Sequence, residues 1–299
     1  MIITRLVGGI GNQMFQYATG RALAHRLDTQ LLLDVSHFQH TTDRHYDLGC
    51  FSIQEMLATQ SDLDDIQTVA DTTYKKYFKI FRSTFRGRKP IVRFKERYFH
   101  FDSSVLTLPD NTYIEGYWQS EKYFKEIEHV IRNEFHIKKP PDLLNKKIGN
   151  DILACEAVSI HVRRGDYVTN PITNRILGLC NSDYYNKSVE DIAQKLDRPV
   201  FFIFSDDPIW TKANLQLDYP RVYISHNGPE RNYEDLRLMS MCQHNIVANS
   251  SFSWWGAWLN SHEHKNVYVP ENWFRRAIME TKDLIPDSWI KVKNENYMN

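Results

Sequence analysis

Four apolar segments of this chain, each expected to be a strand, end in polar residues suited to binding an anionic ligand. Glycines and amides follow residues 2–7, and arginines with an aspartate follow residues 157–162. Two aspartates follow residues 200–204, and an Asn-Ser-Ser sequence follows residues 245–248. Because ligands of open parallel α/β sheets bind beyond the carboxyl ends of the strands, we interpret these polar groups together, as the parts of a ligand site.

The paired arginines Arg163 and Arg164 are the strongest single indication of phosphate chemistry. A guanidinium group presents a fixed fork of N–H donors that suits phosphate oxygens, and it stays charged at any relevant pH. If the strand continues, Arg164 points away from Arg163, and Asp166 is placed to form a salt bridge with one of them. We expect at least one of the two arginines to contact the ligand.

The sequence Asn249-Ser250-Ser251 precedes a predicted helix. There it would offer backbone N–H groups, hydroxyl groups and the positive end of the helix dipole to an anion, although ordinary helix capping by serine accounts for the same residues. Asp206 and Asp207 would accept hydrogen bonds from the ribose or base of a nucleotide. Adjacent carboxylates on one loop cannot flank a glycosidic bond, which argues against a glycoside hydrolase.

The glycine loop at residues 8–13 does not match a dinucleotide fingerprint, because Met14 stands where a third glycine is required. The loop also lacks the lysine of a P-loop. Close approach of the backbone to a ligand at Gly9 and Gly11, with Asn12 as a hydrogen-bond donor, is one interpretation. A sharp turn from strand to helix is the other.

Composition narrows the class of protein. The chain has 299 residues, 42% of them hydrophobic, with 37 basic and 37 acidic side chains, which excludes a disordered or collagen-like chain and favours two domains. Neither a membrane-spanning run nor a signal peptide is recognisable. The zero net charge gives no general attraction to nucleic acid. The four cysteines have no zinc-ligand spacing and are expected to be reduced thiols.

The order of the expected elements predicts an α/β fold. Residues 1–35 have the pattern of a βαβ unit, residues 36–150 are mixed, and residues 140–150 resemble a linker. From residue 151 onward, short apolar strands alternate with helical stretches, which predicts a doubly wound parallel sheet. The expected helices cover residues 183–196, 208–215, 233–242 and 253–259, with Asp207 as the N-cap before Pro208. The tryptophans at 254, 255 and 258 have helical spacing and are assigned to the core.

Five blocks of this sequence together resemble the bacterial α-1,2-fucosyltransferase family, and they occur in that family's order. The blocks are GGIGNQMFQYA (8–18), GYWQSEKYF (116–124), HVRRGDY (161–167), FSDD (204–207) and NSSFSWW (249–255). The resemblance implies a GT-B-like α/β architecture, with two Rossmann-like domains facing a central cleft. Residues 1–150 would form an acceptor-side domain and residues 151–299 a GDP-fucose-binding domain.

The resemblance also implies a reaction. L-fucose would pass from GDP-fucose to the 2-hydroxyl of a terminal galactose on a glycan, with inversion and without a metal or other cofactor. Since breaking a sugar–phosphate bond builds negative charge on GDP, a fixed cation must replace the metal. Arg163 would hold the β-phosphate, and Asn12 would lie near the reacting bond.

The remaining site residues follow from the same resemblance. His161 and Asp235 would bind guanine, and Ser250, Ser251 and Phe252 would line the phosphates. The catalytic residues expected are therefore Arg163, Asn12 and Asp166. The residues expected to bind GDP-fucose are Gly9, Gly11, His161, Arg163, Asp206, Asp207, Asp235, Ser250, Ser251 and Phe252. No residue is assigned as the base; Asp166, His37 and Glu115 are candidates.

Two alternatives remain. One is another GDP-sugar or nucleotide-sugar transferase with the same cleft. The other is a nucleic-acid-binding protein that uses the basic block at residues 71–100, which has ten basic and two acidic side chains and several aromatic ones. The neutral charge of the whole chain argues against nucleic-acid binding. Because the expected acceptor is a lipid-linked glycan, such as an O-antigen precursor, we prefer to interpret this block as a patch that contacts anionic membrane lipids. The enzyme would then be cytoplasmic, peripheral on the inner membrane face. The sequence does not identify the acceptor or the oligomeric state.

Overall fold

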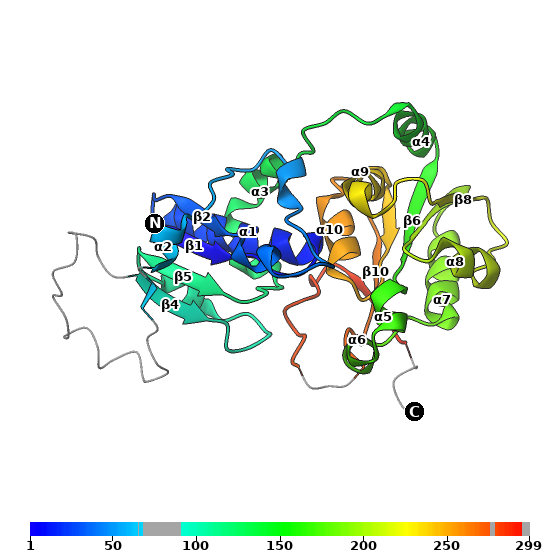
Figure 1. Cartoon of the computed structure of the whole chain (residues 1–299). Coiled ribbons are helices and arrows are strands. Elements are labelled where there is room, and N and C mark those ends of the chain that lie inside the picture. Colours follow the sequence, from blue (N-terminus) through cyan, green and yellow to red (C-terminus); the bar gives the residue numbers. More distant parts are fainter. Residues whose placement is uncertain (65, 68–90, 276–278, 295–299) are drawn as a thin grey trace, which may run out of the picture. The chain divides into compact units, whose positions relative to one another are not determined.

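The computed structural model describes residues 1–64, 66–67, 91–275 and 279–294 of the chain (Figure 1). The chain divides into two compact units, one formed by residues 1–49 and 53–134 and the other by residues 50–52 and 135–299. The boundary along the chain thus lies at 134/135, whereas the sequence analysis places it at 150/151. The assignment of acceptor and donor roles to the two domains stays a prediction.

The first unit begins with the predicted βαβ arrangement. Strands β1 (Ile2–Arg5) and β2 (Leu31–Asp34) pair in parallel, and α1 (Ile10–Arg26) connects them. Helix α1 starts earlier than expected, because Gly9 occupies its N-cap position. Gly11 and Asn12 therefore lie in the first helical turn and not in a loop.

Strands from the mixed region complete the first sheet. Its order is β2-β1-β5-β4-β3, and every neighbouring pair is parallel. The added strands are β3 (Ile66–Gln67), β4 (Ile91–Lys95) and β5 (Thr112–Glu115), and the helices are α2 (Gln60–Asp64) and α3 (Glu128–Glu134). Short 3₁₀ turns cover Ser36–Gln39, Leu48–Cys50, Ser103–Thr107, Glu121–Tyr123 and Lys125–Ile127. These short elements do not repeat the clear strand–helix pattern of the C-terminal half, which is why the sequence left this region unassigned.

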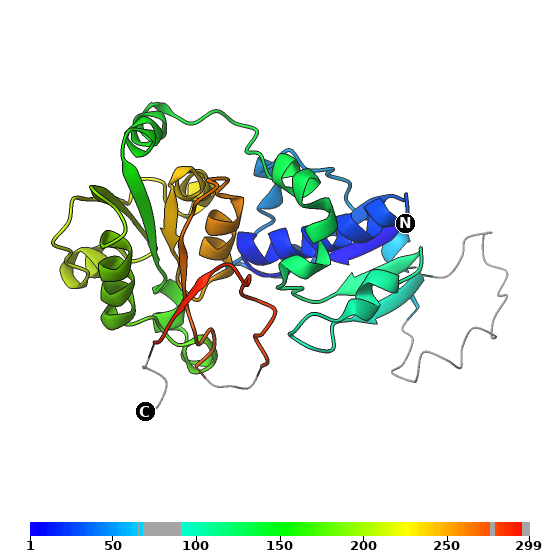
Figure 2. The same cartoon turned by 180° about the vertical axis from the view of Figure 1, so that it is seen from behind.

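The second unit contains a parallel sheet of six strands in the order β11-β10-β9-β6-β7-β8. The strands are β6 (Glu156–Val162), β7 (Pro199–Ser205), β8 (Arg221–Ile224), β9 (His244–Ile246), β10 (Val267–Pro270) and β11 (Ile290–Val292). Strands β7 and β10 are largely apolar, as expected of a parallel sheet whose two faces are both covered by helices. The predicted doubly wound arrangement is confirmed, and β11 (red in Figure 2) is an edge strand that the sequence did not predict.

Helices surround this sheet on both faces. Figure 1 shows α7 (Ser182–Ala193) and α8 (Pro208–Asn214) on one face, and α9 (Asn232–Met241) and α10 (Ser251–Leu259) on the other. Two short helices, α5 (Gly165–Thr169) and α6 (Pro171–Leu177), follow β6 directly. The tryptophans of α10 are buried, as predicted. No helix in the described part of the chain is long and apolar enough to cross a bilayer.

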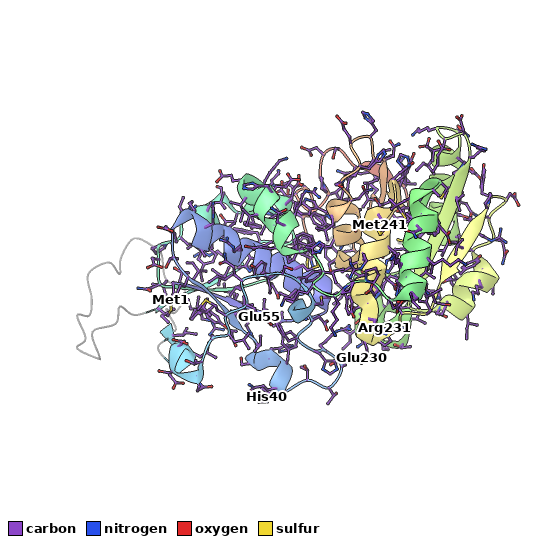
Figure 3. All side chains as sticks on the ribbon, turned by 90° about the horizontal axis from the view of Figure 1, so that it is seen from above. Met1, His40, Glu55, Glu230, Arg231 and Met241 are labelled. Atoms are coloured by element: carbon purple, nitrogen blue, oxygen red, sulfur yellow. The ribbon has the colours of Figure 1, made fainter. Side chains whose placement is uncertain are left out.

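The linker predicted at residues 140–150 is wrong, because α4 (Leu143–Leu153) occupies most of it. Asp142 caps this helix by accepting a hydrogen bond from the Asn145 N–H. Buried Ile148 and Ile152, one turn apart, give the polar stretch a narrow apolar face. Helix α4 packs against α9, whose two ends are marked by Arg231 and Met241 in Figure 3.

Candidate functional site

Arg163 lies at the carboxyl end of β6 and joins two carboxylates. Its Nη2 lies 2.5 Å from Asp166 Oδ1, and its Nη1 lies 2.9 Å from Asp206 Oδ2. Burial opposes the charged form, but these carboxylates outweigh it, so the pKa of Arg163 is raised. The buried Nε–H has no hydrogen-bond partner within the described residues. The guanidinium group is therefore held in place and still keeps N–H donors for a further acceptor.

Arg164 has different partners from Arg163, although strand β6 ends at Val162 and neither arginine continues it. Its Nε lies 3.1 Å from Asp207 Oδ2, and its guanidinium stacks on the Trp210 ring at 3.6 Å from the centroid. The other oxygen of Asp207 accepts the Trp210 N–H and caps α8, which confirms the predicted N-cap. Arg164 thus pairs with Asp207 and packs on Trp210, whereas Arg163 is the arginine whose buried Nε–H has no partner among the described residues.

Asp206 is bonded to both arginines, and Asp207 is bonded to Arg164. Asp206 accepts both the Arg164 backbone N–H at 2.8 Å and the Arg163 guanidinium. It also packs so closely on Gly165 that a β-carbon there would lie 2.5 Å from its Oδ2. Contact of these two carboxylates with a nucleotide, and a catalytic role for Asp166, stay predictions.

Tyr167 connects the arginine to the end of β9, a role the sequence analysis did not foresee. The Arg163 guanidinium lies 5.2 Å from the centroid of its ring, and its hydroxyl donates to the Asn249 carbonyl at 3.0 Å. The Asn249 side chain is itself fixed by donating to the Leu177 and Trp273 carbonyls. Arg163 and the start of α10 therefore belong to one connected group of side chains.

Helix α10 begins without a side-chain cap. Ser250 occupies the N-cap position, but its hydroxyl makes no capping hydrogen bond, so the alternative interpretation as ordinary serine capping does not hold for Ser250. Helices α4, α6, α7 and α8 of the same unit have such a bond, whereas α5 and α9 also begin without one. The first N–H groups of α10 and the Ser250 and Ser251 side chains can therefore bind an anion at the positive end of the helix dipole.

His161, the sixth residue of β6, points its ring toward this helix. Its ring centroid lies 5.3 Å from that of Phe252, and its buried Nδ1 has no partner among the residues described. Burial, with a contribution from Arg163, lowers the pKa of His161 to about 3. The imidazole is therefore neutral and offers one donor and one acceptor.

Asp235 lies in the first turn of α9 and belongs to a different cluster. Its Oδ1 accepts a hydrogen bond from Asn227 Nδ2 at 2.7 Å, and Asn227 also bonds to Asn145 of α4. Burial raises the pKa of Asp235 to about 6. The loop that carries Asn227 follows β8, so Asp235 lies at the same edge of the sheet as Arg163, although no hydrogen bond joins the two in the described structure.

The glycine loop of the first unit forms the tight turn that the sequence predicts. Gly8 has a φ of +77°, which favours glycine, and a β-carbon there would lie 2.7 Å from Asn12 Nδ2. A β-carbon on Gly9 would meet nothing within 4 Å. Asn12 Oδ1 accepts a hydrogen bond from Gln119 Nε2 at 2.8 Å. Binding of a ligand at Gly9, Gly11 and Asn12 stays a prediction.

Buried glutamines brace this loop, and the sequence analysis missed them. Gln13 donates to the Gly8 and His45 carbonyls, and Gln16 accepts the Val7 N–H and donates to the Gly116 carbonyl. Gln13 and Gln16 lie three positions apart on one helical face, beside the apolar residues of the stretch 14–18. This spacing indicates that both glutamines are buried and hydrogen-bonded. Their long side chains bond to the backbone of segments before and after the helix, at Val7, Gly8, His45 and Gly116.

The three candidate bases differ in their surroundings. Glu115 pairs with Arg5 at 2.6 Å and with Arg93. Although burial opposes ionisation, these arginines lower the pKa of Glu115, which makes it a poor base. Asp166 is paired with Arg163, and the His37 ring packs against Phe38. None of these contacts identifies the base.

The basic block falls largely on residues 68–90, which lie outside the described residues, so its predicted membrane contact is untested. In the parts of the chain that are described, no group of three or more His, Cys, Asp or Glu side chains could hold a metal ion. The expected metal independence stays a prediction.

Comparison with known proteins gives a consistent result. The profile described as Glycosyl transferase family 11 matches residues 1–293. Two Escherichia coli proteins are similar over nearly their whole length. An alpha-1,2-colitosyltransferase is 32% identical, over 98% of this chain and 99% of the relative. The O-antigen biosynthesis glycosyltransferase WbnK is 33% identical, over 96% and 99%.

Two further proteins are more distant. A galactoside alpha-(1,2)-fucosyltransferase 1 from Rattus norvegicus is 25% identical, over 66% of this chain and 54% of the relative. The structure of a mutant of Arabidopsis thaliana FUT1 in complex with GDP covers 92% of this chain and 71% of its own, with a TM-score of 0.52 and 11% identity. At that identity the likeness concerns the fold alone, and it agrees with the predicted GT-B type of α/β fold.

Proposed function

Because the chain belongs to glycosyl transferase family 11, we propose that it transfers L-fucose from GDP-fucose to the 2-hydroxyl of a terminal galactose on a glycan. The observation that carries the proposal is the group around Arg163, where a fixed guanidinium, the uncapped start of α10 and a neutral histidine are connected. A nucleoside diphosphate needs such a group when no metal neutralises it.

In the proposed reaction the galactose 2-hydroxyl oxygen attacks C1 of fucose while the bond from C1 to the phosphate oxygen breaks. The bond pair stays on the β-phosphate of GDP, and the hydroxyl proton passes to a base that remains unassigned. Attack from the face opposite the phosphate inverts C1. Arg163 and the first N–H groups of α10 stabilise the charge that develops on the phosphate. Asn12 donates a hydrogen bond to the oxygen of the breaking bond.

The guanine base would be read by His161 and Asp235. The N1–H and 2-amino groups of guanine are donors, and the ionised Asp235 carboxylate is an acceptor with one oxygen oriented by Asn227. The neutral His161 ring, next to Phe252, supplies one further donor or acceptor. Adenine has no N1–H donor, so a carboxylate at this position favours guanine.

A second candidate donor is GDP-colitose, because one of the relatives is a colitosyltransferase. Colitose is L-fucose without the 3-hydroxyl group, so the same diphosphate site suits both. A polar side chain that bonds to that hydroxyl would favour fucose strongly, whereas an apolar contact would favour colitose. The name of the other Escherichia coli relative supports an O-antigen glycan as the acceptor.

The test is a transfer assay with purified protein and a panel of GDP-fucose, GDP-colitose and GDP-mannose. The acceptors are lactose, N-acetyllactosamine and a β1,3-linked galactoside, each with and without EDTA. We expect GDP-fucose to give the highest kcat/KM, an α-1,2 linkage in the product, and no loss in EDTA. Preference for GDP-mannose, or loss of turnover in EDTA, would contradict the proposal. Preference for GDP-colitose would support the second candidate instead.

A further inference from the structure

The segment that follows β5 is fastened to the start of α1 by two side-chain hydrogen bonds within the first unit. Gln16 Nε2 donates to the Gly116 carbonyl at 3.1 Å, and Gln119 Nε2 donates to Asn12 Oδ1 at 2.8 Å. Gln119 is buried, with 8% of its surface exposed. The position of Asn12 thus depends on a turn more than one hundred residues away in the sequence.

This turn is held in an unfavourable form. Trp118 has a φ of +57°, a left-handed conformation that is rare for a bulky residue. The Glu96 carboxylate accepts the Tyr117 N–H at 2.7 Å and the Trp118 N–H at 3.0 Å. Burial raises the pKa of Glu96 to about 7, so keeping this carboxyl group ionised costs the folded protein free energy. Strained backbone and perturbed pKa values are both found most often at sites where a protein positions functional groups.

The Asn12 side-chain amide is constrained at both ends. Its Oδ1 is occupied by the Gln119 donor, and its Nδ2 lies against the α-carbon of Gly8, where a β-carbon would be 2.7 Å away. Nδ2 makes no hydrogen bond to any of the described residues. Its N–H donors are therefore available to a ligand at the carboxyl end of β1.

We infer that Gln119 is a positioning residue, whose hydrogen bond decides that Asn12 presents its Nδ2 donors, and not its Oδ1 acceptor, to the sugar substrate. An amide that is free to turn over would present either group. In the structure the buried Gln119 amide nitrogen faces Asn12 Oδ1, and this hydrogen bond holds the Asn12 amide in one orientation. The inference rests on the proposed function, in which Asn12 donates to the oxygen of the breaking sugar–phosphate bond.

The test reverses the polarity of this contact. Gln119→Glu has nearly the same size, but its carboxylate can only accept, so Asn12 would turn over and present Oδ1. We expect kcat of transfer to fall by about 100-fold, the effect of losing one well-placed donor. KM for the donor and Tm should change little. Gln54→Glu, which makes the same chemical change at an exposed position of the same unit, is the control and should leave kcat unchanged.

A double-mutant cycle separates positioning from a merely structural role. Once Asn12 is replaced, the orientation of its amide no longer matters, so Asn12→Ala/Gln119→Glu should be no slower than Asn12→Ala. If Gln119→Glu lowers Tm, Gln119→Met keeps the length without a charge, and the same lack of additivity is expected. Losses that add in the cycle, or an unchanged kcat in Gln119→Glu, would overturn the inference while wild-type transfer still supports the proposed function. A wild-type protein inactive with every donor of the panel would overturn both.

Discussion

The carboxyl group of Asp235 makes GDP binding sensitive to pH in a way that can be calculated. Burial raises its pKa from the ordinary 3.8 to about 6. If the N1–H and 2-amino groups of guanine bind the ionised form, affinity is lost as the pH falls through 6. About nine-tenths of the groups are ionised at pH 7 and about one-tenth at pH 5, so Kd for GDP should rise about tenfold between them. His161, with a pKa of about 3, stays neutral throughout.

Isothermal titration of GDP into wild type and Asp235→Asn at pH 7 and pH 5 measures this effect. The variant keeps the size of the side chain and the oxygen that accepts from Asn227. It loses the charge, so at pH 7 it should bind GDP at least about tenfold more weakly. The phosphates of GDP titrate equally in both proteins, so the ratio of their Kd values isolates Asp235. Equal affinities at pH 7, or a ratio that does not change with pH, would refute the assignment of Asp235 to guanine.

The fold of the variant can be checked by the same linkage argument. A raised pKa means that the folded state favours the protonated carboxyl, so its contribution to stability is present at low pH and is lost as the pH rises through 6. Asp235→Asn removes the ionisation. At pH 8 its Tm should therefore equal or exceed that of the wild type. A clearly lower Tm would mean that weaker GDP binding reflects damage to the fold.

Two further predictions concern Arg163 and its partner Asp166. Arg163→Lys should lower kcat/KM by about 100-fold, because one ammonium group cannot bridge Asp166 and Asp206 and also bind a phosphate; near-normal kinetics would argue against the diphosphate site. The two arginines and three aspartates at residues 163, 164, 166, 206 and 207 sum to a charge of −1. Asp166→Asn makes this sum zero, so isothermal titration should show a lower Kd for GDP. An unchanged Kd for GDP together with a kcat of transfer about 100-fold lower would instead favour Asp166 as the base.

The sequence determined the elements wherever a local pattern was strong. The continuous apolar run of β7 identifies a strand of a parallel sheet, and Asp207 before Pro208 identifies the start of α8. Because polar residues end the predicted strands, the sequence also indicated that Arg163 lies at the ligand-binding edge.

The same reasoning failed where the pattern was weak. Two prolines and a polar composition predict a linker at residues 140–150, although Ile148 and Ile152 share one face of what is in fact helix α4. The strands of the mixed region are not recognisable from the sequence, because they are short and only their pairing defines them: β5 pairs with β1, β4 with β5, and β3 with β4.

Only the tertiary structure decided what each polar side chain does. Asp206 and Asp207 are adjacent in the sequence and looked equivalent, yet one bridges two arginines and the other caps a helix. Tyr167 meets Asn249, and Gln119 meets Asn12, across long stretches of chain. Such hydrogen bonds depend on distances of about 3 Å between residues brought together by packing, and no local periodicity encodes them.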